Sequence, residues 1–136
     1  MAKEAPVWSV SVDDSAAALK DISNDVLTVG VRTPSGVQDV TGVDKAGMER
    51  LLLLGDGEVV LTGVFNDAAS MSHAVFKNYR TLSGSEVGRT VTIVLSGQTL
   101  SMEMIAESYD LARGADGSAT FSVTLRLSSG TVPSWS

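Results

Sequence analysis

The sequence predicts a small, mainly β protein, an antiparallel β-sandwich or barrel with one flanking α-helix. Apolar residues make up 43% of the chain and charged residues 19%, which is typical of a globular protein. Valine, threonine and glycine are plentiful and only 5% of residues are aromatic, a mixture that favours strands and turns. Segments that alternate apolar and polar residues recur between glycine turns. The 136 residues suffice for one hydrophobic core, and we find no repeat or linker, so we expect one domain over residues 1–136.

The first third of the chain predicts two strands. Val7 to Val12 alternates between apolar residues and serine, which indicates a half-buried strand. Ala16 to Ile22 fits either a helical turn or a short extended piece. Asp25 to Thr33, rich in valine and threonine, predicts a second strand that Pro34 ends.

The stretch from Pro34 to Met48 is the least regular part of the chain, because it holds one proline and three glycines. Connections of this length without structure are uncommon and tend to be functional or mobile. The alternative is a long hairpin whose strands form only beside a neighbour. Glu49 to Leu54 contains four consecutive leucines, and its short length favours a strand over a helix. Gly55-Asp56-Gly57 then predicts a hairpin turn into a strand over Glu58 to Phe65.

The second half predicts one helix and a meander of three strands. Ser70 or Ser72 is the expected cap of the helix. Short glycine turns join the three strands, each of which has one apolar face. The expected elements are the helix Ala68 to Tyr79 and the strands Arg89 to Leu95, Thr99 to Tyr109 and Ala119 to Leu127.

Both ends of the chain are expected to be arms, at residues 1–7 and 128–136. The first residues lack the apolar stretch of a secretory signal, and no window is apolar enough to span a bilayer, so we expect synthesis in a cytoplasm. Neighbouring subunits are expected to bind through the exposed strand edges, the 34–48 loop and the two arms. The alternative is that they are flexible surface segments.

Composition excludes several kinds of chemistry. The net charge of −6 argues against nucleic-acid binding and against anionic membranes. The absence of cysteine excludes disulfides, thiolate metal sites and a cysteine nucleophile. His73 is the only histidine, and we interpret it as a polar residue in preference to a base or metal ligand.

Acidic residues do not form a recognisable active site either. Asp13-Asp14 and the pair Asp21 and Asp25 lack the spacing of a calcium loop. Glu103 and Glu107 share a strand face about 13 Å apart, farther than the carboxylates of a retaining glycosidase. No phosphate-binding loop or nucleophile elbow occurs. We therefore expect no enzyme, no cofactor and no metal site.

A collinear set of segments covers nearly the whole chain and resembles the major tail (tail tube) proteins of siphovirus-type long-tailed bacteriophages, especially phages of actinobacteria. The specificity comes from the order of the pieces and not from any one motif. The pieces are Asp21–Asp25, Pro34–Lys45, Met48–Gly57, Leu61–Asn66, Ser72–Phe76, Asp116–Ser118 and Gly130–Ser136.

This resemblance implies a virion structural protein that assembles into stacked, usually hexameric rings. The rings form a hollow tube through which DNA passes without specific binding, and an acidic or neutral wall suits that passage. The implied partners are further copies of the chain and the tail terminator, tape measure and distal tail proteins. Fold does not separate contractile from non-contractile tails, so the siphovirus assignment rests on the resemblance alone.

The resemblance also implies site residues. The loop that reaches the adjacent ring is expected at Pro34, Ser35, Gly36, Val37, Gln38, Asp39, Val40, Thr41, Gly42, Val43, Asp44 and Lys45. Contacts between subunits are expected in the arms, at Pro6, Val7, Val132, Pro133 and Trp135. Glu103 and Glu107 face either the tube lumen or the outer solvent. The alternative function is a monomeric β-sandwich module that binds a peptide or glycan through the 34–48 loop.

Overall fold

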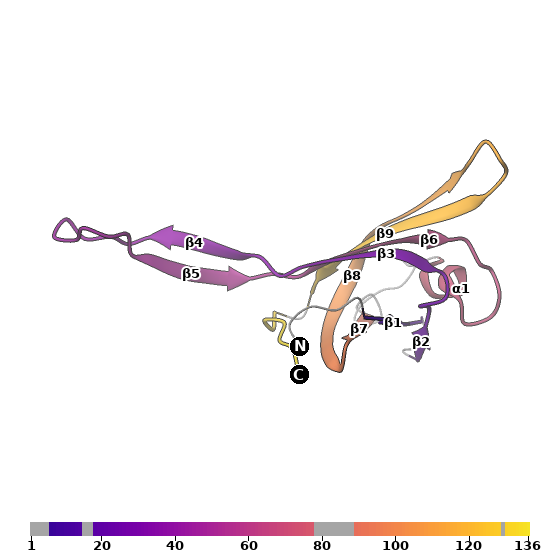
Figure 1. The fold of residues 1–136 in the computed structure, drawn as a ribbon, viewed down its shortest axis with the longest axis horizontal. Coiled ribbons are helices and arrows are strands. Elements are labelled where there is room, and N and C mark those ends of the chain that lie inside the picture. The colour runs from indigo at the N-terminus through magenta and orange to yellow at the C-terminus, as the bar shows by residue number, and fades with distance from the viewer. Residues whose placement is uncertain (1–5, 15–17, 78–88, 129) are drawn as a thin grey trace.

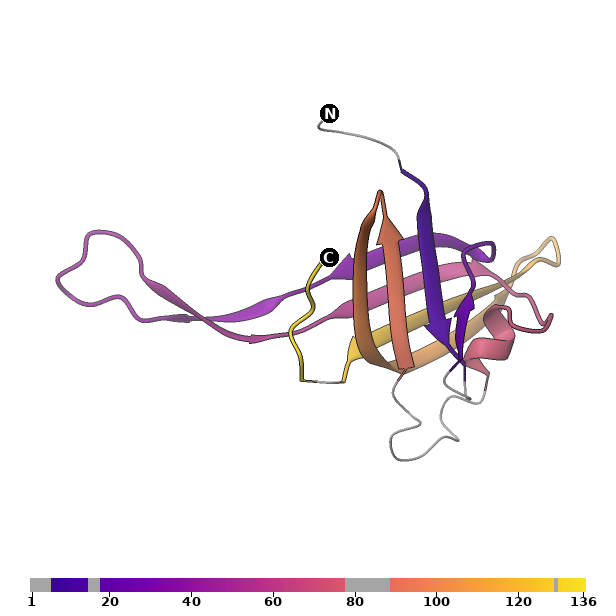
Figure 2. The same ribbon diagram turned by 90° about the horizontal axis from the view of Figure 1, so that it is seen from below.

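Two crossed layers of strands form the body of the protein, and a long two-stranded arm projects from it (Figures 1 and 2). The computed structural model describes residues 6–14, 18–77, 89–128 and 130–136. The elements in this part of the chain are β1 (Trp8–Asp13), β2 (Leu19–Asp21), β3 (Val26–Arg32), β4 (Ser35–Asp39), β5 (Arg50–Gly55), β6 (Glu58–Val64), α1 (Ser72–Phe76), β7 (Arg89–Leu95), β8 (Gln98–Arg113) and β9 (Ala119–Leu127).

All strand pairs in the described ranges are antiparallel. The main sheet has the order β2-β1-β7-β8-β9-β6-β3, and β4 pairs with β5 separately. The 16-residue strand β8 pairs with β7 up to Met104 and with β9 from Met104 onward. One strand therefore passes from one layer to the other. Figure 2 shows β1, β7 and the start of β8 crossing over β9, β6 and β3.

The hydrophobic core lies between the two layers. Alternate residues of β1, β6, β7, β8 and β9 are buried, as the period of two in a strand requires. The short helix α1 closes one end of the core, where the Phe76 ring lies 5.7 Å from that of Tyr109 and 6.2 Å from that of Phe121. The mainly β fold with one small helix confirms the predicted fold class.

Most of the predicted strands are present, and the predicted helix is shorter than expected. Residues 16–22 contain the short strand β2, and β8 continues four residues beyond the predicted end. The helix spans only Ser72–Phe76, and its predicted end at residues 78 and 79 lies outside the described residues. Met71 occupies the N-cap position without a side-chain hydrogen bond. The predicted serine cap is therefore wrong, because the Ser72 hydroxyl donates to the Val64 carbonyl at 3.3 Å instead.

The predicted hairpin turn at Gly55-Asp56-Gly57 is also wrong. Strand β5 pairs with β4, whereas β6 pairs with β3 and β9. The chain runs almost straight from the arm into the body here, and the Asp56 amide donates to the Pro34 carbonyl at 2.8 Å. Pairing between strands distant in the sequence has overridden the local Asp-Gly signal.

Candidate functional site

The projecting arm is a β-hairpin that includes the predicted stacking segment. Strand β4 pairs with β5 from Ser35 opposite Gly55 to Asp39 opposite Arg50, with an irregular step near its base. The alternative of a long hairpin is correct for the strands of this segment, which pair with each other. It is wrong in requiring a neighbour, because the strands form within a single copy of the chain.

Hydrogen bonds around Thr41 organise the tip of the arm. The Thr41 hydroxyl donates to the Asp39 carboxylate at 2.6 Å and accepts from the Glu49 amide at 2.8 Å. The Thr41 amide also donates to Asp39, at 2.9 Å, and these two bonds lower the pKa of the Asp39 carboxyl group. Lys45 and Glu49 form an exposed ion pair at 3.6 Å. The tip is therefore a structured turn with its own polar network.

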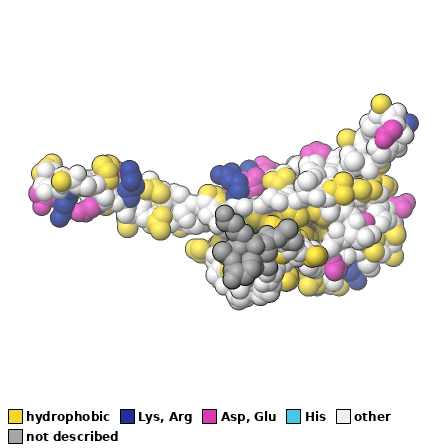
Figure 3. All heavy atoms as spheres, in the orientation of Figure 1, with side chains coloured by type: hydrophobic (Ala, Val, Ile, Leu, Met, Phe, Trp, Pro, Cys, Tyr) yellow, Lys and Arg dark blue, Asp and Glu magenta, His cyan; other side chains and the backbone are white. Residues whose placement is uncertain are grey.

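The arm exposes an unusual amount of apolar surface (Figure 3). Val43 at the tip is fully exposed, and Leu54 near the base is 90% exposed. The other exposed large apolar residues of the arm are Val37, Val40, Met48, Leu51, Leu52 and Leu53. Burying one such side chain is worth about 1.5–3 kcal/mol, so a surface that covered several of them would be bound strongly. Exposed apolar side chains gathered on one segment are typical of surfaces that another molecule covers.

The C-terminal residues pack against the base of the arm and the start of β8. A Cβ atom built on Gly55 would lie 3.3 Å from both methyl carbons of Val132, and one built on Gly57 would lie 3.2 Å from Pro133. Trp135 forms a bridge with Leu100. Val132, Pro133 and Trp135, predicted as contacts between subunits, thus have contacts within their own chain. The residues described near the N-terminus differ, because Pro6 is partly buried and Val7 is 89% exposed.

The layer formed by β3, β6, β9 and the second half of β8 has a polar outer face. Paired residues share a face, so the register gives three rows across these strands. Hydroxyl-bearing and charged side chains predominate among them. The rows are Arg32-Glu58-Arg126-Ile105, Gly30-Val60-Thr124-Ser108 and Thr28-Thr62-Ser122-Asp110.

The first row is a ladder of alternating charges. Arg32 lies 3.5 Å from Glu58, and Glu58 lies 3.8 Å from Arg126. Arg126 in turn donates to Glu107 at 2.7 Å, across from an irregular step in β8. These carboxylates raise the pKa of Arg126, with Glu107 the larger contributor. We call Arg32, Glu58, Arg126 and Glu107 the charge row.

The two acids predicted as a pair belong to different layers. Glu103 lies in the part of β8 that pairs with β7, and it accepts a hydrogen bond from Thr90 at 2.7 Å. Glu107 lies beyond Met104, where β8 pairs with β9. Because β8 crosses between the layers at this point, strand alternation alone does not place the two acids on one surface. Sequence reasoning also missed Arg32, Glu58 and Arg126, which only the strand register brings into one row.

The residues considered for other chemistry have structural contacts. His73 Nδ1 lies 3.1 Å from the Tyr109 hydroxyl, and the His73 ring packs 4.8 Å from that of Phe65. Asp25 is buried and accepts from the Ser72 amide, whereas Asp21 accepts from Ser23. Within the described ranges, no cluster of three or more potential metal ligands occurs. No helix in these ranges is long and apolar enough to cross a membrane.

A shallow open groove of about 480 Å³ lies between β1 and β3, two strands that do not pair with each other. Its apolar lining consists of Trp8, Val10, Val26, Leu27 and Val29. Among the groove's lining residues, Trp8 is the only aromatic one. A single aromatic side chain gives little support to a peptide- or glycan-binding groove.

Comparisons with known proteins show which fold this is. No protein-family model matches the sequence, and no curated protein does. The structure is similar to a chain in the tail of an empty gene transfer agent particle refined helically with C6 symmetry, at 16% identity, with a TM-score of 0.71 and 94% of each chain covered. It is similar to a chain in the virion of a native gene transfer agent particle, at 16% identity, with a TM-score of 0.71 and 96% and 95% coverage of this chain and that chain.

A third similar structure comes from a different kind of particle. It is a chain in the six-fold symmetrised baseplate of the anti-feeding prophage, at 12% identity, with a TM-score of 0.65 and coverage of 100% of this chain and 96% of that chain. The protein therefore has the fold of chains that are components of phage-like tails.

Proposed function

We propose that this protein is a virion structural protein that assembles into the hollow tail tube of a long-tailed bacteriophage. Copies join side by side into rings, and the rings stack along a common axis. The single observation that carries this proposal is the arm: a formed hairpin, held away from the body, whose large apolar side chains are exposed.

The arm suits contacts between rings because of its length and its chemistry. It leaves Val43 and Leu54 exposed to solvent, outside the chain's own core, where a second ring would cover them. The predicted stacking residues from Pro34 to Lys45 form one strand and most of the tip. In this proposal β5 contributes as well, through Leu51–Leu54.

The polar outer face of β3, β6, β9 and β8 is the proposed wall of the channel. Its threonine and serine side chains carry no positive charge, and both of its arginines, Arg32 and Arg126, are paired with carboxylates in the charge row. Glu107 belongs to this wall, whereas we assign Glu103 to the opposite layer. DNA then passes without specific binding, and the protein acts without catalysis or cofactor.

Several finer features belong to the same proposal. Six-fold rings are supported by the C6 and six-fold symmetry of the similar particles. The non-contractile, siphovirus-type tail and the actinobacterial host are supported by the sequence resemblance. Capping by tail terminator, tape measure and distal tail proteins rests on that resemblance as well.

Negative-stain electron microscopy of the purified chain over a concentration series tests the proposal. We expect rings or hollow tubes from the wild type. The matched variant replaces residues 38–51 by Asn-Gly, which joins the paired residues Val37 and Leu52 through a two-residue turn. We expect this variant to form separate rings or monomers, because the body retains every strand of the main sheet.

Two outcomes would contradict the proposal. If the shortened variant also formed tubes, the arm would not be the contact that stacks the rings. A wild type that stays monomeric at every concentration, even when seeded with tail initiation complexes, would favour the alternative of a monomeric peptide- or glycan-binding module.

A further inference from the structure

We propose that an ion pair joins neighbouring copies of the chain, between Arg32 at the end of the charge row of one copy and Asp110 of the next. This inference rests on the proposed side-by-side joining of copies. It adds the residues that fix the register of that joint.

The two borders of the polar layer are suited to each other. Strand β3 is the last strand of the main sheet, and the described part of β7 pairs with β8 only as far as Met104. The distal half of β8 and the outer edge of β3 therefore present backbone groups that no described strand pairs. Strand directions alternate along β8, β9, β6 and β3, so β3 of one copy meets β8 of the next in antiparallel orientation.

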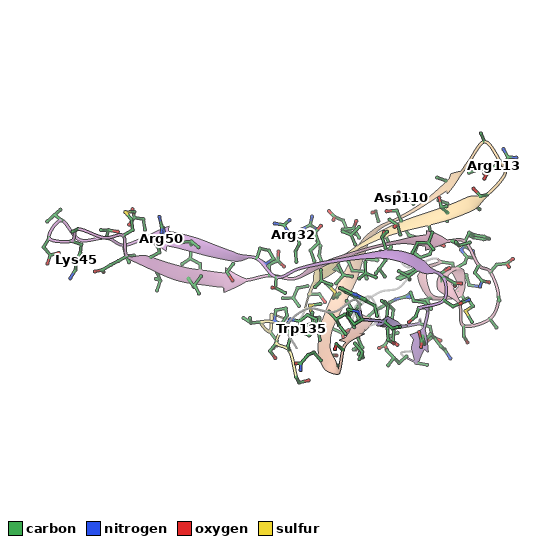
Figure 4. All side chains as sticks on the ribbon, in the orientation of Figure 1. Arg32, Lys45, Arg50, Asp110, Arg113 and Trp135 are labelled. Atoms are coloured by element: carbon green, nitrogen blue, oxygen red, sulfur yellow. The ribbon has the colours of Figure 1, made fainter. Side chains whose placement is uncertain are left out.

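Charge makes these borders complementary. The charge row begins with a cation on β3, Arg32, and ends with an anion on β8, Glu107. Arg32 has a side chain that is 72% exposed, although it contacts Glu58. Asp110 is exposed on the same side of the layer, as Figure 4 shows. Two copies placed border to border thus bring an arginine to acidic side chains.

Barrel geometry and charge together select Asp110 as the partner. Four strands about 4.8 Å apart span about 19 Å, measured perpendicular to the strands. At the usual strand tilt of about 35–45°, each copy is displaced along the strands by about 13–19 Å, or about four to six residues. A shift of four residues places Arg32 at the row of Thr28, which contains Asp110, and a shift of six places it at the row of Val64, which contains Ala112. Of these two residues of β8, only Asp110 carries a charge that can pair with Arg32.

The sense of the displacement follows from the edge that is already paired. A shift in the opposite sense would set Arg32 against the part of β8 before Met104, whose outer edge pairs with β7. Only the shift toward Asp110 places β3 against the distal half of β8. The ion pair and the strand pairing therefore require the same arrangement.

Charge reversal of each partner tests this pairing. Arg32→Asp leaves an aspartate opposite Asp110, and Asp110→Arg leaves an arginine opposite Arg32. We expect either variant alone to need about three- to tenfold more protein for half-maximal assembly at low salt. An equimolar mixture of the two variants restores opposite charges at every joint in an alternating ring, so we expect it to assemble near the wild-type concentration.

Controls separate the pair from general charge and folding effects. Arg113→Asp changes an exposed charge in a row with Ala119, on the other face of the layer, and we expect it neither to weaken assembly nor to rescue Asp110→Arg. Thermal unfolding of each monomeric variant shows whether its fold is intact. At about 1 M salt the differences between the wild type and both variants should shrink, because the Debye length falls to about 3 Å.

The outcomes are distinguishable from those of the proposed function. Assembly of the wild type without rescue in the mixture, while the monomers remain folded, would overturn the Arg32–Asp110 pair and leave the tube proposal standing. Failure of the wild type to assemble, even when seeded, would overturn both.

Discussion

Asp25 at the start of β3 and Ser72 at the start of α1 are joined by a hydrogen bond, in which the Ser72 amide donates to the Asp25 carboxylate at 3.1 Å. Asn66 donates to the same carboxylate at 3.0 Å. Both Asp25 and Ser72 are buried. This carboxylate therefore fixes the loop and the helix that close one end of the core.

Replacing Asp25 by alanine should destabilise the fold, because the buried Ser72 amide would lose its acceptor. We expect the free energy of unfolding to fall by about 1–3 kcal/mol in urea denaturation. Asp25→Asn keeps one acceptor oxygen and should cost less. An equal loss in both variants would show that the charge, and not the acceptor, stabilises this end of the core.

Gly63 should tolerate no side chain. A Cβ atom there would lie 2.0 Å from the Asp25 carbonyl oxygen and 2.9 Å from the Val26 Cα, both of which are backbone atoms. We expect Gly63→Ala to cost about 3 kcal/mol of stability or to prevent folding. Gly47→Ala, in open space at the tip of the arm, is the matched control and should change stability by less than about 0.5 kcal/mol.

Charged substitutions on the arm should block assembly without affecting the fold. Val43→Asp and Leu54→Asp place a carboxylate on fully or largely exposed positions, so the monomer's stability should change by less than about 0.5 kcal/mol. Sedimentation velocity should then show monomers or rings where the wild type forms tubes. Leu19→Asp, at a half-exposed position on β2 far from the arm, serves as the control and should still form tubes.

Asp21 should make stability depend on pH in the acidic range. The hydroxyl and the amide of Ser23 donate to its carboxylate at 2.6 and 2.9 Å, which lowers the Asp21 pKa from its ordinary 3.8. A carboxyl group with a lowered folded pKa stabilises the fold fully above the unfolded value, and the contribution disappears as the pH falls through the folded pKa. The stability difference between wild type and Asp21→Ala should be constant from about pH 5 to 7 and shrink below pH 3.8. A difference that persisted unchanged at lower pH would contradict this.

Removing residues 134–136 should weaken the start of β8. The Thr99 N–H donates to the Ser136 carbonyl at 2.8 Å, and the Ser136 N–H donates to the Thr99 carbonyl at 2.9 Å. Trp135 lies beside the buried Leu100. We expect a loss of about 1–3 kcal/mol and faster amide exchange at Thr99. Trp135→Ala keeps the two backbone bonds and should leave the exchange at Thr99 slow.

The meander of β7, β8 and β9 shows what the sequence can predict. Strict alternation and the turns at Ser96-Gly97 and Asp116-Gly117 specify strands, faces and neighbours within a short stretch of chain. Both β7 and β9 have the predicted bounds. Local patterns suffice here because each strand pairs with the next one in the sequence.

The arm shows why the remaining strand pairings could not be predicted from the sequence. Gly55-Asp56-Gly57 carries a strong local turn signal, yet the chain continues through it because β6 pairs with β3. A local sequence pattern gives no information on how strongly a strand pairs with a segment more than twenty residues away. The surface residues were unpredictable for the same reason. Alternation on one strand suggests a common face for Glu103 and Glu107, but β8 passes between the layers and separates them. The charge row depends on the register of four strands, which the sequence alone does not show.

Strand β8 also bears on how the protein loses its structure. Its first half is a member of one layer and its second half of the other, so the two layers share a continuous segment of backbone. Neither layer can open and leave the other intact, and we expect the body to unfold as one cooperative unit with a single transition. The arm lies outside this unit, because β4 and β5 pair only with each other. A free subunit can therefore open its arm and close it again while the body stays folded.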